Sequence, residues 1–277
     1  MTIYHLGLIG YPVSHSLSPK IQNAALKASG LDGEYSLYPI QPDDQTGLKD
    51  LLDRVRAGEI TGFNVTIPHK QNVIPFLDEL TPTAQTIGAV NIIYVRENKL
   101  IGDNTDAPGF LTDLNRFIAN RHSSIENRKS SIVLGAGGSA RSVVYALHDD
   151  GWKVTLAARR IEQAEQLAAT FPNYHVSLTD FQSLQLATFD LLVNTTPLGM
   201  TPNIDASPVP EEITLPGDMM IYDLVYNPRE TKLIRDARTQ GLYATTGLGM
   251  LVEQAALGFE LWTGRKLSSE IFRNAVD

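Results

Sequence analysis

Apolar positions along the chain follow two alternating patterns. Short runs rich in β-branched residues predict strands, and longer stretches with apolar residues three or four apart predict helices. In the early part of the chain the strands are expected over 3–9, 34–40, 60–67 and 89–95, and the helices over 18–29 and 45–57. For the first helix we expect Ser18 as the N-cap, Pro19 at the first helical position and Gly30 just beyond the end.

The later part of the chain continues the alternation. Helices are predicted over 108–120 and 250–262, and strands over 131–134, 153–157, 190–194, 220–225 and 243–245. Strands that alternate with helices are typical of βαβ units and of a largely parallel sheet. Because the pattern changes near Asp106, we predict two α/β domains, with the second beginning there. Apolar patterning alone does not assign the last helix to either domain.

Composition and charge narrow the class of protein. The 277 residues include no cysteine, which excludes disulfides, thiolate metal sites and cysteine nucleophiles. A formal net charge of −8 argues against broad nucleic-acid binding, which needs a basic surface. No apolar run approaches the roughly 20 residues that span a bilayer, and the start lacks the plan of a signal peptide. We therefore expect a soluble, cytoplasmic protein that binds neither nucleic acid nor membrane.

Residues 131–140 (SIVLGAGGSA) predict a strand, a Gly-x-Gly-x-x-Ala turn and a helix. In such a turn Gly135 permits the tight bend, Gly137 lets a pyrophosphate approach the backbone, and Ala140 allows the helix to pack closely on the strand. The helix N-terminus supplies N–H donors for phosphate. Because the strand and helix are both in place, we favour dinucleotide binding over a purely structural turn.

Arg159 and Arg160 follow the next predicted strand, where an NAD site usually carries an acidic residue. Guanidinium groups match a ribose 2′-phosphate in charge and geometry, so the pair favours NADP over NAD. The alternative is that the arginines only open the helix that contains Glu162 and Glu165, with Glu162 neutralising one of them.

Ser14 and Ser16 stand two apart in an extended segment before the first helix, so their hydroxyls can point the same way. Beside a helix N-terminus they could hold a carboxylate without a basic side chain. The alternative reading is ordinary turn and capping chemistry.

Residues 64–70 (NVTIPHK) place polar side chains where a strand is expected to end. Asn64 and Thr66 share one strand face, at the edge where parallel sheets bind ligands. A proton-transfer group could be His69, since histidine titrates near neutral pH, or Lys70. The residues alone leave these two nearly even, and a solvated loop lysine is the alternative without a role in catalysis.

Asp106 stands next to the start of a predicted helix, within residues 102–109 (GDNTDAPG). Its structural interpretation is an N-cap supplied by Thr105 or Asp106. Its functional interpretation is a carboxylate that faces Lys70 and positions it for proton transfer. The chain has no His-Glu-x-x-His, Tyr-x-x-x-Lys or Gly-x-Ser-x-Gly, so no metal site, tyrosine-based reductase site or hydrolase nucleophile is predicted.

These motifs together resemble the shikimate dehydrogenases, the NADP-dependent enzymes of aromatic amino-acid biosynthesis. The resemblance covers nearly the whole chain, with its blocks in the same order. The blocks are 10–19 (GYPVSHSLSP), 64–70 (NVTIPHK), 88–91 (GAVN), 102–109 (GDNTDAPG), 135–141 (GAGGSAR), 194–200 (NTTPLGM), 223–228 (DLVYNP) and 247–256 (GLGMLVEQAA).

The resemblance implies a role for each candidate residue. It implies that Ser14 and Ser16 hold the substrate carboxylate, that Lys70 exchanges a proton and is paired with Asp106, and that Tyr226 closes on the substrate. The residues implied to bind ring hydroxyls are Asn64, Thr66, Asn91, Asp106 and Gln254. The residues implied to bind NADP are Gly135, Ala136, Gly137, Gly138, Ser139, Ala140, Arg159, Arg160, Thr195, Leu224, Gly247 and Met250, with the last three near the nicotinamide half.

One block departs from the family. After the second strand of the cofactor domain the family usually has Asn-Arg-Thr, with another arginine three residues later. This chain has Ala158, Arg159 and Arg160, and Gln163 stands at the later place. We expect Arg160 to take the place of the lost arginine.

The resemblance also implies an arrangement of domains and a reaction. A substrate-binding domain with a mostly parallel sheet would span 1–105 and be completed by helices in 248–277, around a Rossmann-type NADP-binding domain over 106–247. The reaction would be the reversible NADP-dependent reduction of 3-dehydroshikimate to shikimate. Alternatives are a quinate or mixed quinate/shikimate dehydrogenase, and a non-catalytic NADP-binding regulatory paralogue. Both monomer and homodimer are compatible with the sequence.

Overall fold

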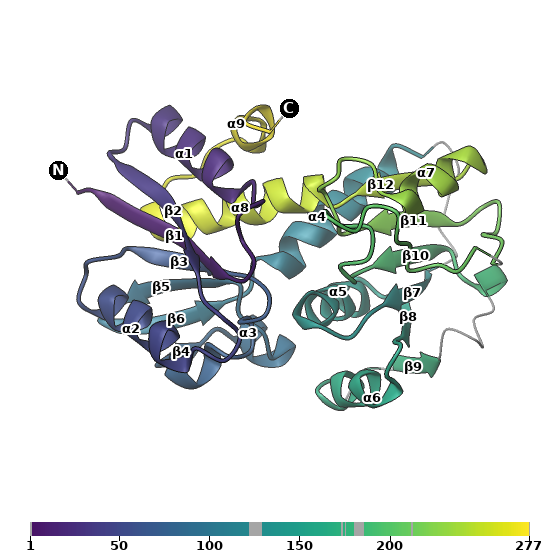
Figure 1. Cartoon of the computed structure of the whole chain (residues 1–277), viewed down its shortest axis with the longest axis horizontal. Coiled ribbons are helices and arrows are strands. Elements are labelled where there is room, and N and C mark those ends of the chain that lie inside the picture. Colours follow the sequence, from purple (N-terminus) through teal and green to yellow (C-terminus); the bar gives the residue numbers. More distant parts are fainter. Residues whose placement is uncertain are drawn as a thin grey trace. The chain divides into compact units, whose positions relative to one another are not determined.

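The computed structural model describes residues 2–121, 129–172, 174, 176–179, 186–211 and 213–276. The chain forms two compact units, one of Met1–Gly109 with Leu251–Asp277 and one of Phe110–Met250 (Figure 1). The chain passes from the first unit to the second within helix α4, Asp106–Ala119, and returns within helix α8, Leu248–Thr263. No helix in the described ranges is both long and apolar enough to cross a lipid bilayer.

The first unit contains a six-stranded mixed sheet in the order β2-β1-β3-β5-β6-β4. β1 pairs in parallel with β2 and β3, whereas β5 runs antiparallel to β3 and β6. Strands β4 and β6 are not predicted from the sequence. The hairpin that joins β5 to β6 has Glu97 and Asn98 at positive φ and lacks the usual glycine, and β4 is only two residues long. The strands are β1 (Tyr4–Gly10), β2 (Gly33–Pro39), β3 (Gly62–Val65), β4 (Glu79–Leu80), β5 (Ile92–Arg96) and β6 (Lys99–Asp103).

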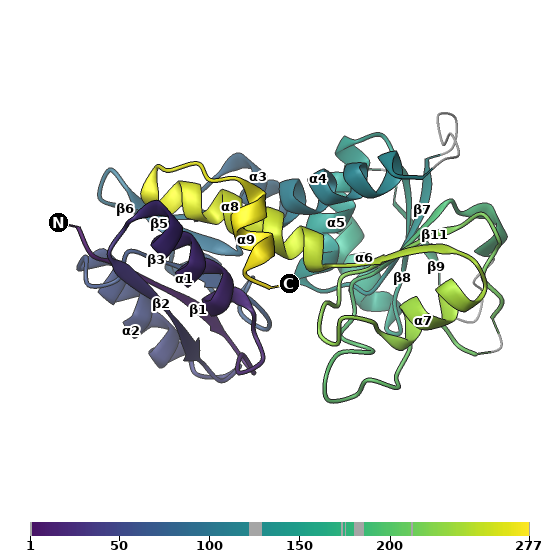
Figure 2. The same cartoon turned by 90° about the horizontal axis from the view of Figure 1, so that it is seen from above.

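Helices cover both faces of this sheet (Figures 1 and 2). One face carries α2 (Gln45–Arg56), the short η1 (Ile74–Phe76) and α3 (Pro82–Ile87), and the other carries α1 (Ser18–Ser29), α8 and α9 (Ser269–Asn274). Phe63 and Val65 of β3 belong to the core under α2. Because side chains alternate along a strand, Asn64 between them points to the face covered by α8.

The start of α1 differs from the expectation. The predicted N-cap at Ser18 is wrong, because Ser18 is already the first helical residue and Leu17 holds the N-cap position without a side-chain bond. A turn closed from the N–H of Ser16 to the Val13 carbonyl precedes the helix, and the Ser16 hydroxyl accepts the Ser18 N–H at 3.2 Å. The end of the helix is as predicted, since Gly30 adopts the left-handed conformation with φ of 65°.

The second unit contains a six-stranded, wholly parallel sheet in the order β12-β11-β10-β7-β8-β9. Counted from its own first strand this is the order 6-5-4-1-2-3 of a Rossmann domain, so the predicted fold class is confirmed. The strands are β7 (Ser130–Leu134), β8 (Lys153–Ala157), β9 (Val176–Thr179), β10 (Leu191–Asn194), β11 (Met220–Asp223) and β12 (Tyr243–Thr246). The helices between them are α5 (Gly138–Asp149), α6 (Ile161–Ala169), η2 (Leu186–Thr188) and α7 (Lys232–Thr239).

Helix α8 lies close against the sheet of the first unit. The indole N–H of Trp262 donates to the carbonyl of Ile93 on β5 at 3.0 Å. A Cβ added to Gly62 on β3 would collide with that same carbonyl and with the indole nitrogen. Glycine at position 62 therefore permits the close approach that brings α8, and with it Gln254, against the strands.

We expect Gly62→Ala to lower the free energy of unfolding by about 2–3 kcal/mol, because the added methyl group meets backbone that cannot move aside alone. Urea unfolding measures the change. The matched control is Gly217→Ala, where an added Cβ has no atom within 4 Å, and its stability should stay within about 0.5 kcal/mol of the parent. Equal stability of the two variants would contradict the packing argument.

Candidate active site

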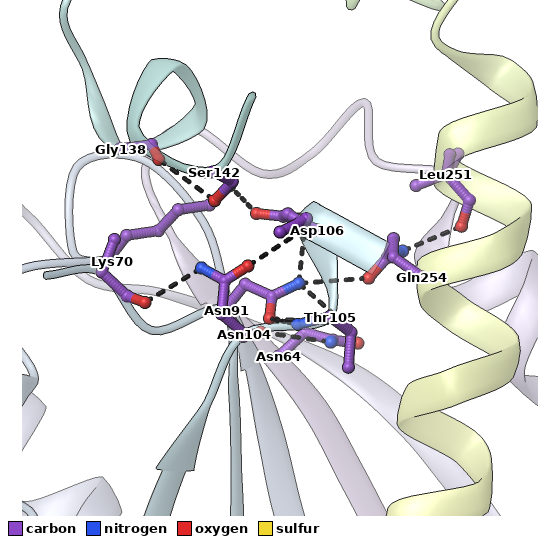
Figure 3. Close-up of polar contacts among 12 residues, drawn as sticks. Asn64, Lys70, Asn91, Asn104, Thr105, Asp106, Gly138, Ser142, Leu251 and Gln254 are labelled. Carbon is purple, nitrogen blue, oxygen red and sulfur yellow. Dashed lines mark hydrogen bonds and ion pairs between the residues drawn. The ribbon is translucent and has the colours of Figure 1, made fainter. Parts of the chain in front are cut away.

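Lys70 and Asp106 form a buried ion pair in the first unit (Figure 3). Lys70 follows β3 and Asp106 opens α4, and the distance from Nζ of the lysine to Oδ2 of the aspartate is 2.6 Å. Their side chains are only 10% and 8% exposed. A buried charge is costly unless it is paired, so the pair holds both groups in one geometry. The predicted juxtaposition of these two residues is present.

Asn91 joins the elements around this pair. Its Nδ2 donates to Oδ1 of Asp106 and to Oγ1 of Thr105, each at 2.9 Å, and its Oδ1 accepts the N–H of Thr105 at 2.7 Å. The two oxygens of Asp106 are thus bonded separately, one to the lysine ammonium and one to an amide. This division fixes the plane of the carboxylate, and Oε1 of Gln254 from α8 lies 3.5 Å from the same Nδ2 (Figure 3).

The N-terminus of α4 is capped by Asn104, a residue to which the sequence motifs assign no role. Oδ1 of Asn104 accepts the N–H of Ala107 at 3.2 Å, and Nδ2 of Asn104 donates to the carbonyl of Ala89 at 2.9 Å. The oxygens of Asp106 are engaged by Lys70 and Asn91, so its carboxylate is not the cap. The Thr105 hydroxyl is bonded to the side chain of Asn91, so neither of the two predicted residues supplies this cap, and the Asp106 carboxylate faces the lysine.

His69 is engaged in the fold. The residue is 0% exposed, its Nε2 lies 2.8 Å from the carbonyl of Ile40, and its Nδ1 lies 3.5 Å from Nδ2 of Asn72. Because a carbonyl can only accept, Nε2 is the donor in this bond, and the ring is held in place by it. The geometry therefore favours Lys70 over His69 as the proton-transfer group. Across the described ranges no three His, Asp or Glu side chains are grouped as a metal site requires.

The other expected substrate residues of the first unit lie on neighbouring elements. Asn64 is 5% exposed, and its Nδ2 donates to the carbonyl of Asn91 at 3.2 Å. β3 ends at Val65, so Thr66 stands just beyond the strand rather than within it, half-buried. Ser14 is exposed and Ser16 half-buried, in the turn before α1. The Ser16 oxygen caps the Ser18 N–H, which leaves its hydroxyl proton to donate.

Five of the expected cofactor residues of the second unit stand just beyond the carboxyl ends of its parallel strands. The residues that follow a strand in this way are Gly135 after β7, Arg159 after β8, Thr195 after β10, Leu224 after β11 and Gly247 after β12. The strand order reverses between β7 and β10, and the crevice beside such a reversal is where open α/β sheets bind ligands.

The glycine-rich turn has the geometry that a pyrophosphate requires. Gly135 has a φ of 111°, and a Cβ there would lie 2.7 Å from the Thr195 hydroxyl. A Cβ on Gly137 would meet no atom within 4 Å, so the space in front of this backbone is open. Ala140 is 0% exposed against the sheet. The turn therefore fits a dinucleotide, with Ala136, Gly138 and Ser139 completing the segment that leads into α5.

Arg159 and Arg160 are both exposed, and Arg160 occupies the N-cap position of α6. Within the described part of the chain neither guanidinium is in an ion pair, including with Glu162. The proposed neutralisation by Glu162 is therefore not found among these residues. Both charges remain available for an anionic ligand at this edge.

Tyr226 and Met250 complete the set of predicted residues, and both belong to the second unit. Tyr226 lies after β11 and is half-buried, and Met250 is 7% exposed in the first turn of α8. The closing of Tyr226 on the substrate stays a prediction.

Asp223 is a buried carboxylate at the end of β11 that enters the sequence reasoning only as part of a motif. It is 0% exposed and accepts hydrogen bonds from Nδ2 of Asn194 at 2.8 Å, from the Val225 N–H at 3.1 Å and from the Thr231 hydroxyl at 2.6 Å. Burial raises the pKa of Asp223 from 3.8 to about 6, against the lowering effect of these hydrogen bonds. The carboxylate thereby ties the end of β10 to the loop after β11.

Comparison with protein families matches three segments of the chain. Residues 8–93 match the shikimate dehydrogenase substrate binding domain, residues 118–240 match the shikimate / quinate 5-dehydrogenase family, and residues 247–276 match the shikimate 5′-dehydrogenase C-terminal domain.

Individual relatives match over nearly the whole length. The chain is 42% identical to a protein of Salinibacter ruber, over 97% of this chain and 95% of that one, and 39% identical to one of Methanocaldococcus jannaschii, over 98% and 95%. Both are described as shikimate dehydrogenase (NADP(+)). A crystal structure of shikimate 5-dehydrogenase from Thermus thermophilus in complex with NADP(H) and shikimate superimposes with a TM-score of 0.86 at 36% identity, covering 98% of each chain.

The raised pKa of Asp223 predicts a pH dependence of stability. Between pH 3.8 and about 6 the folded state binds more protons at this carboxyl than the unfolded state, so the free energy of unfolding falls as pH rises through this window. A pKa raised from 3.8 to about 6 corresponds to about 3 kcal/mol. The difference in stability between the parent and Asp223→Asn should therefore shift by about 2 kcal/mol, against the parent, from pH 4 to pH 7, because at pH 4 the unfolded carboxyl is already partly ionised.

Urea unfolding at several pH values measures this difference. In a Trp262→Phe background, Trp152 is the remaining tryptophan of the chain and reports the second unit. Asp205→Asn, at an exposed carboxyl, is the control and should follow its parent at every pH. A constant difference between Asp223→Asn and its parent across the range would refute the assignment.

Proposed function

The chain belongs to the shikimate dehydrogenase family, and from this premise we propose that it catalyses the reversible NADP-dependent reduction of 3-dehydroshikimate to shikimate. The observation that carries the proposal is the buried Lys70–Asp106 pair, with Asn91 bonded to the second carboxylate oxygen. In this proposal the first unit binds the substrate and the second binds NADP.

The first unit offers complementary groups to each part of the substrate. The hydroxyls of Ser14 and Ser16 stand in the turn before α1, where the helix dipole favours an anion, and they receive the carboxylate. The ring hydroxyls are bound by Asn64, Thr66, Asn91, Asp106 and Gln254. Amide and carboxylate groups held in place by one another recognise hydroxyls without a large loss of side-chain freedom on binding.

Lys70 is the group that moves the proton. In the direction of reduction its ammonium donates a proton to the carbonyl oxygen of the substrate, and in the direction of oxidation its amine takes the hydroxyl proton back. Asp106 orients the lysine through the 2.6 Å contact and receives a substrate hydroxyl. Because Asn91 holds the other oxygen of Asp106, the carboxylate does not rotate away as the lysine changes charge.

The second unit holds the dinucleotide. NADP supplies a hydride acceptor or donor at its nicotinamide. The turn over 135–140 receives the pyrophosphate, and Arg159 and Arg160 bind the ribose 2′-phosphate. Thr195 also binds the cofactor. Leu224, Gly247 and Met250 lie near the nicotinamide half, and Tyr226 closes on the substrate. A cytoplasmic location, and a monomeric or homodimeric state, belong to the proposal as well.

The purified chain tests the proposal with shikimate or quinate, each with NADP⁺ or NAD⁺, by following the absorbance of reduced cofactor. We expect the fastest reduction with shikimate and NADP⁺. Faster reduction of the cofactor with quinate would show that quinate, and not shikimate, is the preferred substrate. No reduction of the cofactor in any mixture would favour a regulatory protein without catalytic activity.

Lys70→Ala should lower kcat by about 10²–10⁴-fold, with a small change in the KM for shikimate, because the lysine acts on the proton in the transition state. Steady-state kinetics with shikimate and NADP⁺ measure the effect. Lys49→Ala is the control, since Lys49 lies on the exposed face of α2 in an ion pair with Asp53, and its kcat should match the parent. A Lys70→Ala enzyme with parental kcat would remove the lysine from the mechanism.

Replacing Arg159 and Arg160 together with alanine should raise the KM for NADP⁺ by about 10–100-fold and leave the KM for NAD⁺ nearly unchanged, because only NADP⁺ carries the phosphate they bind. Arg265→Ala, an exposed arginine of the first unit, is the control for loss of positive charge. An equal rise in both KM values would show that the arginines do not select the phosphate.

A further inference from the structure

Tyr35 is a buried tyrosine of β2 that no expected role includes. It is 3% exposed, and β2 is the edge strand beside β1. On the edge of β2 that faces away from β1, the side-chain amide of Asn23 from α1 hydrogen-bonds to both the N–H and the carbonyl of Tyr35. Oδ1 of Asn23 accepts the Tyr35 N–H at 2.8 Å, and its Nδ2 donates to the Tyr35 carbonyl at 3.2 Å. The backbone that carries this tyrosine is therefore held from two sides.

The ring of Tyr35 is held as well. It packs against Trp262 of α8, with ring centroids 6.2 Å apart at an angle of 54°. Trp262 is itself fixed by its bond to the carbonyl of Ile93. With backbone and ring both constrained, the hydroxyl of Tyr35 occupies a defined position, 2.8 Å from Oδ1 of Asn64.

The hydrogen bonds around Asn64 have a single consistent direction. The carbonyl of Asn91 can only accept, so the atom of Asn64 that lies 3.2 Å from it is the nitrogen Nδ2. The atom that faces Tyr35 is then the oxygen Oδ1, and the tyrosine hydroxyl is the donor. Of the two N–H groups on Nδ2, one is used by Asn91 and the second is left to face another acceptor.

We propose that Tyr35 is a positioning residue, which orients the amide of Asn64 so that the second N–H of Nδ2 donates to a ring hydroxyl oxygen of the substrate. The orientation of the Asn64 amide is inferred from hydrogen bonds within the first unit, whereas the identity of the substrate depends on the proposed function. Without the tyrosine donor, Oδ1 loses its partner and the amide is held by the Asn91 carbonyl alone, so the angle at which the second N–H meets the substrate is less well fixed.

Tyr35→Phe removes the hydroxyl and keeps the ring against Trp262. Loss of one neutral hydrogen bond of about 1 kcal/mol corresponds to about a fivefold rise in the KM for shikimate. We expect kcat and the KM for NADP⁺ to stay within about twofold of the parent, because neither Lys70 nor the second unit is touched. Tyr94→Phe is the matched control, a tyrosine of β5 in the same sheet that is 7% exposed, and it should leave all three constants unchanged.

A double-mutant cycle separates positioning from a general effect on the fold. In an Asn64→Ala background, Tyr35→Phe should cause no further rise in the KM for shikimate, because the proposed effect on the substrate passes through the Asn64 amide. An unchanged KM in the single variant, a parallel rise in the KM for NADP⁺, or full additivity in the cycle would each overturn the proposal.

A readout without substrate keeps this inference distinct from the proposed function. The side-chain amide signals of Asn64 in a ¹⁵N–¹H spectrum, identified by their loss in Asn64→Ala, should shift in Tyr35→Phe and stay in place in Tyr94→Phe. Unmoved signals would overturn the orientation, even in an active enzyme. Shifted signals in a chain that does not oxidise shikimate would support the orientation and refute the proposed function.

Discussion

The burial of an ion pair is the constraint on which the first unit depends. Lys70 and Asp106 are nearly inaccessible to solvent. A buried charged group is stable only where an opposite charge and hydrogen bonds replace the water that it has lost. The fold meets this requirement from several elements, since Asn91 bonds the second oxygen of Asp106 and Asn104 caps the helix that Asp106 opens. Because Asn104 supplies the cap, the carboxylate of Asp106 bonds the lysine and, in the proposed function, the substrate. The antiparallel pairing of β3 with β5 makes this possible, because it brings Asn91 beside the end of β3.

Further hydrogen bonds, each with a defined donor and acceptor, connect the surroundings of the Lys70–Asp106 pair to the rest of the first unit. The carbonyl of Asn91 accepts from the amide nitrogen of Asn64, and the hydroxyl of Tyr35, on the edge strand, donates to the oxygen of the same amide. Each of these groups is neutral, so its net contribution to stability is about 1 kcal/mol, but together they leave few alternative arrangements of donors and acceptors. Recognition of a polyhydroxylated ring needs such an arrangement, because each hydroxyl is both a donor and an acceptor.

The second unit solves a different electrostatic problem in an acidic chain. The formal net charge is −8, yet the proposed cofactor is a polyanion. Attraction must therefore be local, from the helix N-terminus behind Gly137 and from Arg159 and Arg160, whose guanidinium groups are exposed at the end of β8. Asp223 is buried at the carboxyl end of β11 in the same sheet. Burial raises its pKa, and three hydrogen bonds hold it between β10 and the loop after β11.

Features that depend on local pattern were predictable from the amino-acid sequence alone. Strand and helix periodicity, the glycine-rich turn at 135–140 and the left-handed Gly30 follow from neighbouring residues, which is why the α/β class and most elements could be predicted. The hairpin at Glu97 and Asn98 and the start of α1 were not, because their turns lack the usual residues. The residues alone left His69 and Lys70 nearly even, and it was the resemblance to a family that favoured Lys70. The roles of Asn104 and Tyr35 required the folded chain. Those roles depend on which donor meets which acceptor across segments distant in the chain, and a one-dimensional pattern carries no information about that encounter.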